Sequence, residues 1–117
     1  MGTKANAHAA MLALIHNVKP PTAENIYVGV TEYRPNPNGN VTHIFPTIYS
    51  YGPHFPLVVW DTRSRDFYVN NDGTTQTTAT QRAGVREALK AAGYTPNGIV
   101  WYLAPVDHHF EGWSKGT

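Results

Sequence analysis

YSYGPHFPLVVWDTRSRDFYVNNDGTTQTTATQRAGVREAL, residues 49–89, is the stretch of sequence that decides the fold. It begins with an aromatic strand that breaks at a Ser-Tyr-Gly-Pro turn, and a second strand then reaches Trp60. A third strand ends at Asn-Asn-Asp-Gly, and a threonine-rich turn opens onto a helix. Because strand alternation, turn residues and capping residues agree here, the stretch predicts a β-hairpin followed by an amphipathic helix.

The residues upstream of this stretch extend the hairpin into a sheet. Residues 26–33 alternate in the way that strands do, and residues 34–40 are rich in the Pro, Asn and Gly of turns. Pro46 lies in the return strand and predicts an edge strand or a bulge there. Within residues 22–73 we expect a four-stranded antiparallel meander, with strands at residues 26–33, 41–49, 55–60 and 67–70.

A helix is predicted before the sheet. Residues 1–19 are rich in good helix formers, and Pro20-Pro21 would stop the helix. The apolar run at residues 9–15 lies between two histidines and is much shorter than the ~20 apolar residues that span a bilayer. We therefore expect a helix that faces the core, with neither a signal peptide nor a membrane partner.

A second helix is predicted at residues 77–93. Thr78 and Gln81 have the spacing of a capping box at its start, and Gly93 fits a left-handed cap at its end. Its apolar stripe, which includes Val85, would pack on the sheet.

The remaining residues are predicted to form one more strand and a tail. Residues 98–104 form an apolar run typical of a buried strand, and residues 105–117 read as a polar tail. A chain of 117 residues has room for one core. We therefore predict one α+β domain with an N-terminal helix, a four-stranded antiparallel meander, an amphipathic helix packed on the sheet and a final C-terminal strand.

Composition and charge exclude several functional classes. The chain has no cysteine, which excludes disulfides and thiolate chemistry and is typical of a cytoplasmic protein. Nine basic and eight acidic residues give a net charge of +1, so charge alone does not predict a nucleic-acid-binding protein. Any such binding has to depend on a local patch.

The central third of the chain carries a recognisable order of features: an aromatic strand, a Ser-Tyr-Gly turn, an asparagine and a Thr-Thr pair before a helix. The residues concerned are Tyr49, Ser50, Tyr51, Gly52, Asn70, Thr77, Thr78 and the helix from Gln81. In this order the chain resembles a small domain that recurs in bacteriophage proteins of uncharacterised function. The resemblance implies a phage or mobile-element origin, and hence the cytoplasm of a host bacterium, but no activity.

Protein binding is the leading functional hypothesis, either as an inhibitor of a host factor or as a virion or assembly component. The chain has seven tyrosines and three tryptophans, which with arginine dominate binding energy at interfaces. Trp113 and Tyr33 are predicted as exposed anchors, and an edge strand near Pro46 would be able to extend a partner's sheet. A host or phage protein is the expected partner, and homo-oligomerisation is left open.

Nucleic-acid binding is the first alternative. The N-terminus of the second helix would offer N–H groups to a phosphate, and basic residues recur every four residues along its flank. Nearby hydroxyls and aromatic rings would add donors and stacking surfaces. The candidate binding residues are Tyr49, Tyr51, Arg63, Arg65, Thr77, Thr78, Arg82, Arg86 and Lys90.

A metal-dependent hydrolase is the second alternative. Asp107, His109 and Glu111, beside His108, would share one face of an extended strand and are residue types that bind divalent metals. The chain has no HExxH motif, however, and adjacent histidines near a chain end are more often solvated. We therefore predict no metal and no cofactor.

A serine triad can also be assembled from residue types alone. Ser50, His54 and Asp61 are the three types required, but the nucleophile elbow that would present the serine is missing. A serine beside Tyr-Gly-Pro is more simply a turn residue. We therefore predict a binding protein that has no catalytic residues.

Overall fold

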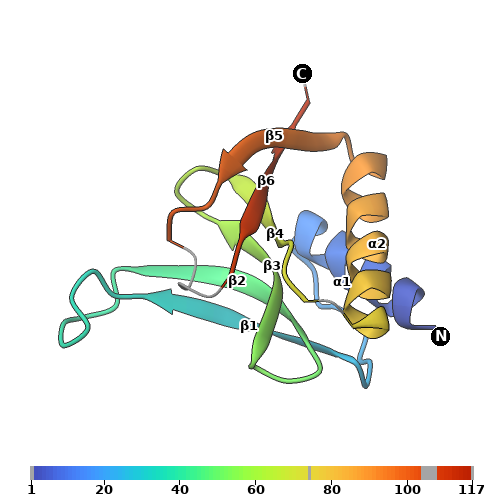
Figure 1. Cartoon of the computed structure of the whole chain (residues 1–117), viewed down its shortest axis with the longest axis horizontal. Coiled ribbons are helices and arrows are strands. Elements are labelled where there is room, and N and C mark those ends of the chain that lie inside the picture. The colour runs from blue at the N-terminus through green and yellow to red at the C-terminus, as the bar shows by residue number, and fades with distance from the viewer. Residues whose placement is uncertain (1, 74, 104–107, 117) are drawn as a thin grey trace.

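One antiparallel sheet with two helices on one of its faces makes up the fold (Figure 1). The computed structural model describes residues 2–73, 75–103 and 108–116. The elements are α1 (Thr3–His16), β1 (Ile26–Tyr33), β2 (His43–Ser50), β3 (Phe55–Asp61), β4 (Asp66–Asn70), α2 (Gln76–Ala91), β5 (Tyr94–Val100) and β6 (Phe110–Lys115). The strands follow the order β1-β2-β3-β4-β6-β5. Neither helix is long and apolar enough to cross a membrane.

The α+β class and the antiparallel meander are confirmed, because β1 to β4 pair in sequence order. The sheet is nevertheless larger than predicted, since the described part of the chain contributes six strands to it. β6 lies inside the predicted polar tail at residues 105–117 and inserts between β4 and β5. The predicted last strand at residues 98–104 is also displaced, because β5 begins at Tyr94; residues 104–107 lie outside the described part of the chain.

The physical reason for the displaced strand is the sequence of β5 itself. Pro96 and Gly98 look like turn residues, and Gly98 does adopt a left-handed φ of 77°. β5 tolerates them because it is an edge strand whose pairing with β6 is interrupted between Pro96 and Val100. Val100 and its neighbour Ile99, predicted to be buried, are exposed at the end of this edge.

The main core lies between the helices and the sheet. Its buried residues are Ala7, Ala10, Met11, Ile26, Ile48, Leu57, Val58, Phe67, Val69, Val85, Ala88, Leu89, Tyr94 and Trp113. The helices approach each other very closely where α2 has Gly84, because a Cβ at this position would overlap the carbonyl oxygen of Lys4. Small residues on α1, such as Ala7 and Ala10, keep that approach possible.

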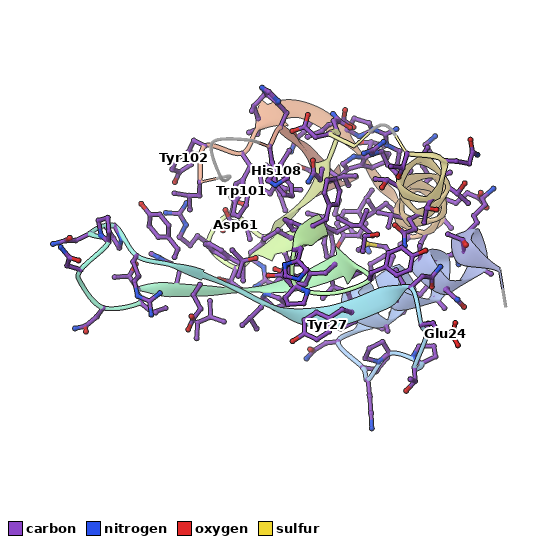
Figure 2. All side chains as sticks on the ribbon, turned by 60° about the horizontal axis from the view of Figure 1, so that its bottom comes forward. Glu24, Tyr27, Asp61, Trp101, Tyr102 and His108 are labelled. Atoms are coloured by element: carbon purple, nitrogen blue, oxygen red, sulfur yellow. The ribbon has the colours of Figure 1, made fainter. Side chains whose placement is uncertain are left out.

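A second, smaller core covers the opposite face of the sheet. It is centred on Trp101, which follows β5 and packs against Phe45, Tyr68 and Phe110 with ring centroids 5.3 to 5.7 Å away. The indole N–H of Trp101 donates to the buried carboxylate of Asp61 at 2.9 Å (Figure 2). Trp101 is therefore held by packing and by a hydrogen bond, although it lies outside any strand.

The β1–β2 hairpin projects beyond the rest of the sheet (Figure 1). Pairing between β2 and β3 extends only to Thr47 opposite Val59, whereas β1 and β2 stay paired as far as Tyr33 opposite His43. Pro46 marks the place where β3 leaves, because proline has no N–H to continue the ladder. The predicted edge or bulge at Pro46 thus corresponds to the base of a projecting hairpin.

Candidate functional site

The predicted basic flank of α2 is mostly engaged within the protein. Arg82 donates from Nε to the carbonyl oxygen of Asn70 at 2.7 Å and from its guanidinium to that of Asp72. Burial, together with neighbouring Arg86, lowers the pKa of Arg82. Arg86 donates to the side chain of Asn71 at 2.6 Å and lies 3.8 Å from the carboxylate of Glu111. Two of the three predicted basic residues therefore hold neighbouring segments in place, while the third, Lys90, is exposed.

The predicted helix cap is wrong in its position. Thr75 is the N-cap, and its side-chain oxygen accepts a hydrogen bond from the N–H of Thr78 at 3.2 Å. Thr78 is itself buried, and Thr77 lies half-buried beside it in the first turn. Gln81 is fully buried and donates to the carbonyl oxygen of Asn25 at 2.8 Å, so it is not available for a capping box. The threonines are therefore part of the scaffold.

The two predicted tyrosines have opposite surroundings. Tyr49 is buried, and its hydroxyl donates to the carbonyl oxygen of Val30 at 2.8 Å. Tyr51 is 60% exposed and adopts a left-handed φ of 64°, which is unusual for a bulky residue. Only Tyr51 is thus able to meet a partner.

The two loop arginines lie at the far end of β3 from Tyr51. Arg63 lies 3.6 Å from the Asp61 carboxylate and bonds to Tyr102, while Arg65 lies 5.7 Å from the Trp60 ring centroid. Tyr51 precedes β3 and the arginines follow it, so a strand of about 20 Å separates them. The nine predicted binding residues therefore do not form one surface.

The residues of the catalytic alternatives do not come together either. The hydroxyl of Ser50 donates to Gln81 at 2.7 Å, and Ser50 pairs with Phe55 at the opposite end of β3 from Asp61. That separation of about 20 Å rules out a triad with His54. Asp107 lies outside the described residues, and in residues 2–73, 75–103 and 108–116 no three His, Asp or Glu side chains gather as a metal site would require.

The histidines after β5 have a structural partner. His109 Nδ1 lies 3.4 Å and His108 Nδ1 lies 3.8 Å from the carboxylate of Asp72. The ring of His108 also packs edge-on against Phe55, with centroids 5.4 Å apart. Glu111 lines one small hollow with His109 but is engaged by Arg86 and Asn71, and no third His, Asp or Glu among the described residues joins the two.

The predicted anchor at Trp113 is also wrong. Trp113 is 1% exposed, because it belongs to β6 and packs under the helices in the main core. Tyr33 is half-buried against the second core. Exposed apolar side chains occur instead on the projecting hairpin.

The outer edge of β1 presents free main-chain groups. β1 is the first strand of the sheet, and among the strands that the structure describes β2 is its neighbour on one side only. The N–H of Tyr51 donates to the carbonyl oxygen of Asn25, so odd-numbered residues of β1 face β2. The even-numbered residues Val28, Val30 and Glu32 therefore direct their N–H and C=O groups outward. Ile26 is excluded from this edge because it pairs with Ala23.

An apolar strip accompanies this edge on the face that carries the helices. Val28, Val30 and Ile44 are 41%, 51% and 53% exposed, because the hairpin extends beyond the cover of α1. Pro46, opposite Val30, continues the strip into a hollow of about 440 Å³ that Trp60 also lines. The strip is thus continuous from the open edge to a recess that side chains of a partner would be able to enter.

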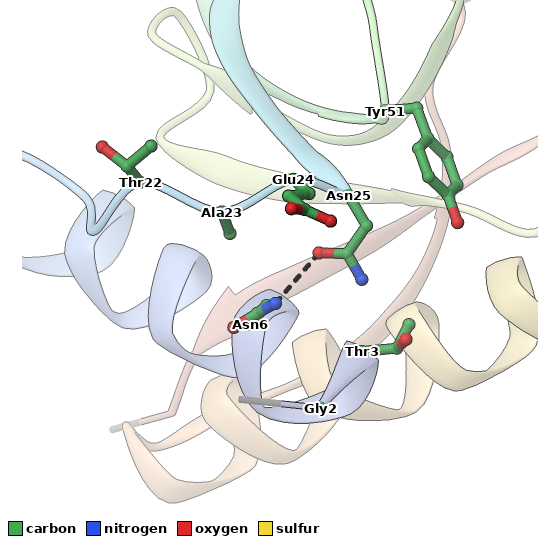
Figure 3. A pocket seen from close by; sticks show the side chains of 8 residues that line it. All are labelled: Gly2, Thr3, Asn6, Thr22, Ala23, Glu24, Asn25 and Tyr51. Carbon is green, nitrogen blue, oxygen red and sulfur yellow. Dashed lines mark hydrogen bonds between the residues drawn. The ribbon is translucent and has the colours of Figure 1, made fainter.

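A second hollow lies where the chain enters β1. It has a volume of about 650 Å³ and is lined by Gly2, Thr3, Asn6, Thr22, Ala23, Glu24, Asn25 and Tyr51 (Figure 3). Asn6 donates to the side chain of Asn25 at 3.1 Å across its floor. Glu24 and the nearby Tyr27 lie at the outside of the molecule, next to the open edge (Figure 2).

The sequence contained one signal for this surface. Residues 26–33 alternate as a strand with one apolar face, and apolar faces are normally assigned to the core. β1 has eight residues, and only Ile26 at its start is buried under the helices, whereas Val28 and Val30 lie on the part of the hairpin that projects beyond them. The open edge therefore has to be interpreted from its own geometry, because comparisons with protein families, with curated proteins and with solved structures gave no match.

Proposed function

We infer that this chain is a non-enzymatic protein-binding domain that recognises its partner through the outer edge of β1. One observation carries the proposal: outward-facing main-chain groups and the exposed apolar side chains of Val28, Val30 and Ile44 lie along one projecting hairpin. In strand addition, main-chain hydrogen bonds give affinity and side-chain pockets give specificity. The hollow beside Pro46 supplies such a pocket.

The charge distribution supports a protein partner over a nucleic acid. Arg82 and Arg86, which a phosphate backbone would need, are bonded to Asn70, Asp72 and Asn71. A nucleic-acid interface needs several free cations because phosphate neutralisation dominates its affinity. An inhibitor of a host factor and an assembly component both fit an exposed edge strand, and in a phage context the partner would be a host or phage protein.

A capture experiment tests the proposed function. Tagged wild-type protein is compared with Val30→Lys, which places a charge on the strip, and with Val18→Lys, which changes another exposed valine outside the hairpin. After nuclease treatment of a bacterial lysate, we expect the wild type and Val18→Lys to retain the same protein and Val30→Lys to lose it. Equal capture by all three, or capture that nuclease abolishes, would contradict the proposal.

A further inference from the structure

We propose that the outer edge of β1 pairs with the same edge of a second copy of this chain, so that one antiparallel sheet runs through both. The inference rests on the proposed function, because it assigns the partner of the same surface. A strand that is paired on one side offers an unsatisfied ladder, and natural proteins normally block such an edge with proline, lysine or a bulge. The two edges of this sheet differ in that respect.

The β5 edge is blocked and the β1 edge is open. β5 contains Pro96, a left-handed Gly98 and an interruption of its pairing with β6. β1 reads IYVGVTEY, without proline or lysine, and pairs with β2 in continuous register from Ile26 to Tyr33. The β1 edge therefore lacks proline, lysine and a bulge, and Glu32 is the one charged residue of its strand.

The open groups define a register that matches itself. Val28, Val30 and Glu32 direct their main-chain groups outward, so a two-fold axis at Val30 lies at the centre of the free segment. Val30 then pairs with Val30 of the second copy, and Val28 pairs with its Glu32. Each hydrogen-bonded pair contributes two bonds, which gives about six between the copies. The Val30 carbonyl, which already accepts from Tyr49, has a second lone pair for this purpose.

Side chains in this register are compatible on both faces of the sheet. On the helix-bearing face the two apolar strips meet at Val30, and the exposed area of Val28 and Ile44 lies beside the junction. On the other face Gly29 lies opposite Thr31 of the second copy, so small residues face each other across the axis. Tyr27, 44% exposed, lies opposite the second copy's Tyr33, a pair of rings that favours contact.

Charges are also complementary in this register. Glu32 lies opposite a valine and not opposite the second copy's Glu32, so like charges are not paired. Arg34, just after the end of β1 and 3.8 Å from Glu32 of its own chain, comes near the second copy's turn at Ala23 and Glu24, and both Arg34 and Glu24 are exposed. Because each copy supplies one cation and one anion, the contact is made twice around the axis.

Engineered cysteines test the register directly, because the natural chain has none. At a Val30→Cys position the two Cα atoms would be about 5.5 Å apart, within the range of a disulfide. Val28→Cys is the matched control, since in this register its two copies would be separated by about 13 Å. We expect oxidation to convert most of Val30→Cys to a covalent dimer and to leave Val28→Cys mostly monomeric.

Sedimentation of the unmodified chain is the second measurement. We expect a concentration-dependent dimer at micromolar concentration, because the contact is smaller than a standard interface of about 1,600 Å². Val30→Lys should be monomeric, whereas Val18→Lys should sediment as the wild type does. A Glu24→Arg or Arg34→Glu change should weaken the dimer several-fold, and the two together should restore it.

A monomer at all concentrations, a dimer that survives Val30→Lys, or equal cross-linking of the two cysteine variants would overturn the self-pairing. These outcomes differ from a failure of the proposed function. If Val30→Lys loses a captured protein while the wild type is monomeric, the edge binds another protein and not itself. If the dimer forms and no protein is captured, the second copy is the partner.

Discussion

Arg82 stabilises the connection between β4 and α2, although its position on a basic flank predicted a binding role. It reaches back from α2 to the carbonyl oxygens of Asn70 and Asp72, which lie on either side of the turn that leaves β4. Its guanidinium thereby closes the connection between the sheet and the helix. Hydrogen bonds from a charged donor are among the stronger ones, and their loss leaves carbonyl groups without a partner.

We expect Arg82→Ala to lower the free energy of unfolding by about 1–3 kcal/mol, because two carbonyl groups lose a charged donor. Lys90→Ala is the matched control, since this exposed cation on the same flank should change stability by less than about 0.5 kcal/mol. Urea denaturation of the three proteins measures both effects. Equal stability of the two variants would show that the Arg82 contacts contribute nothing to the fold.

Individual residues show why the sequence predicted some of the site and not the rest. Leu89 and Val85 occur at helical spacing and are buried as the pattern predicts. Trp101 lies in the apolar run predicted at residues 98–104 and is buried as expected, but outside any strand, whereas Trp113 lies in a strand with glycine and charged neighbours and gave no such pattern. Their burial depends on pairing and packing with distant segments, which local periodicity does not encode.

The contact between α1 and α2 depends on Gly84, because glycine has no side chain that would keep the two helices apart. Gly84 allows the backbone of α2 to meet the carbonyl oxygen of Lys4. Glycine in a helix interior normally costs stability relative to alanine, so its presence here has to be offset by the packing that it permits. The surface ion pair between Lys4 and Glu87 flanks the same crossing.

We expect Gly84→Ala to destabilise the protein by about 1–3 kcal/mol, because the added methyl group forces the helices apart. The control is Ala83→Gly, at an exposed neighbour, which removes only helix propensity and should cost about 0.5–1 kcal/mol. Thermal unfolding followed by circular dichroism compares them. A gain in stability for Gly84→Ala would mean that the helices do not touch there.

The strands show a similar division between what the sequence specifies and what it does not. β1 alternates, and recognisable turns separate the apolar runs of β1 to β4, so the meander was predictable. β6 has buried residues on both faces, with Phe110 in the second core and Trp113 in the main core, and thus no single apolar face. The open edge of β1 was missed for a related reason, since alternation does not reveal whether a strand's apolar face is covered.

For the whole molecule, β6 is the strand on which the sheet depends. It pairs with β4 on one side and with β5 on the other, and Trp113 and Phe110 contribute to both cores. Without β6, β5 has no neighbour among the described strands, and both cores lose a large aromatic residue. β6 therefore joins β5 to the rest of the sheet and contributes to both hydrophobic cores.

A chain that ends at His109 should be largely unfolded, because the loss of two buried aromatic side chains, about 6–10 kcal/mol, and of the pairing of two strands is comparable to the usual total stability of about 5–15 kcal/mol. A chain that ends at Lys115 keeps all of β6 and is the control, with near-native stability expected. Amide dispersion in an NMR spectrum distinguishes the two. A folded shorter chain would contradict the central role of β6.

The position of β6 also has a consequence for how the protein is made. The second edge of β4 stays unpaired until β6, about forty residues further along the chain, has been synthesised. During synthesis the meander and both helices emerge first, with the open edge of β4 and apolar side chains of both cores uncovered. Two strands, β1 and β4, then have unpaired edges at the same time. Nascent chains are therefore at greater risk of non-native strand pairing with one another than complete chains are. Faster synthesis of the residues after β5, or a chaperone that covers β4 until β6 is made, would therefore raise the yield of correctly folded protein.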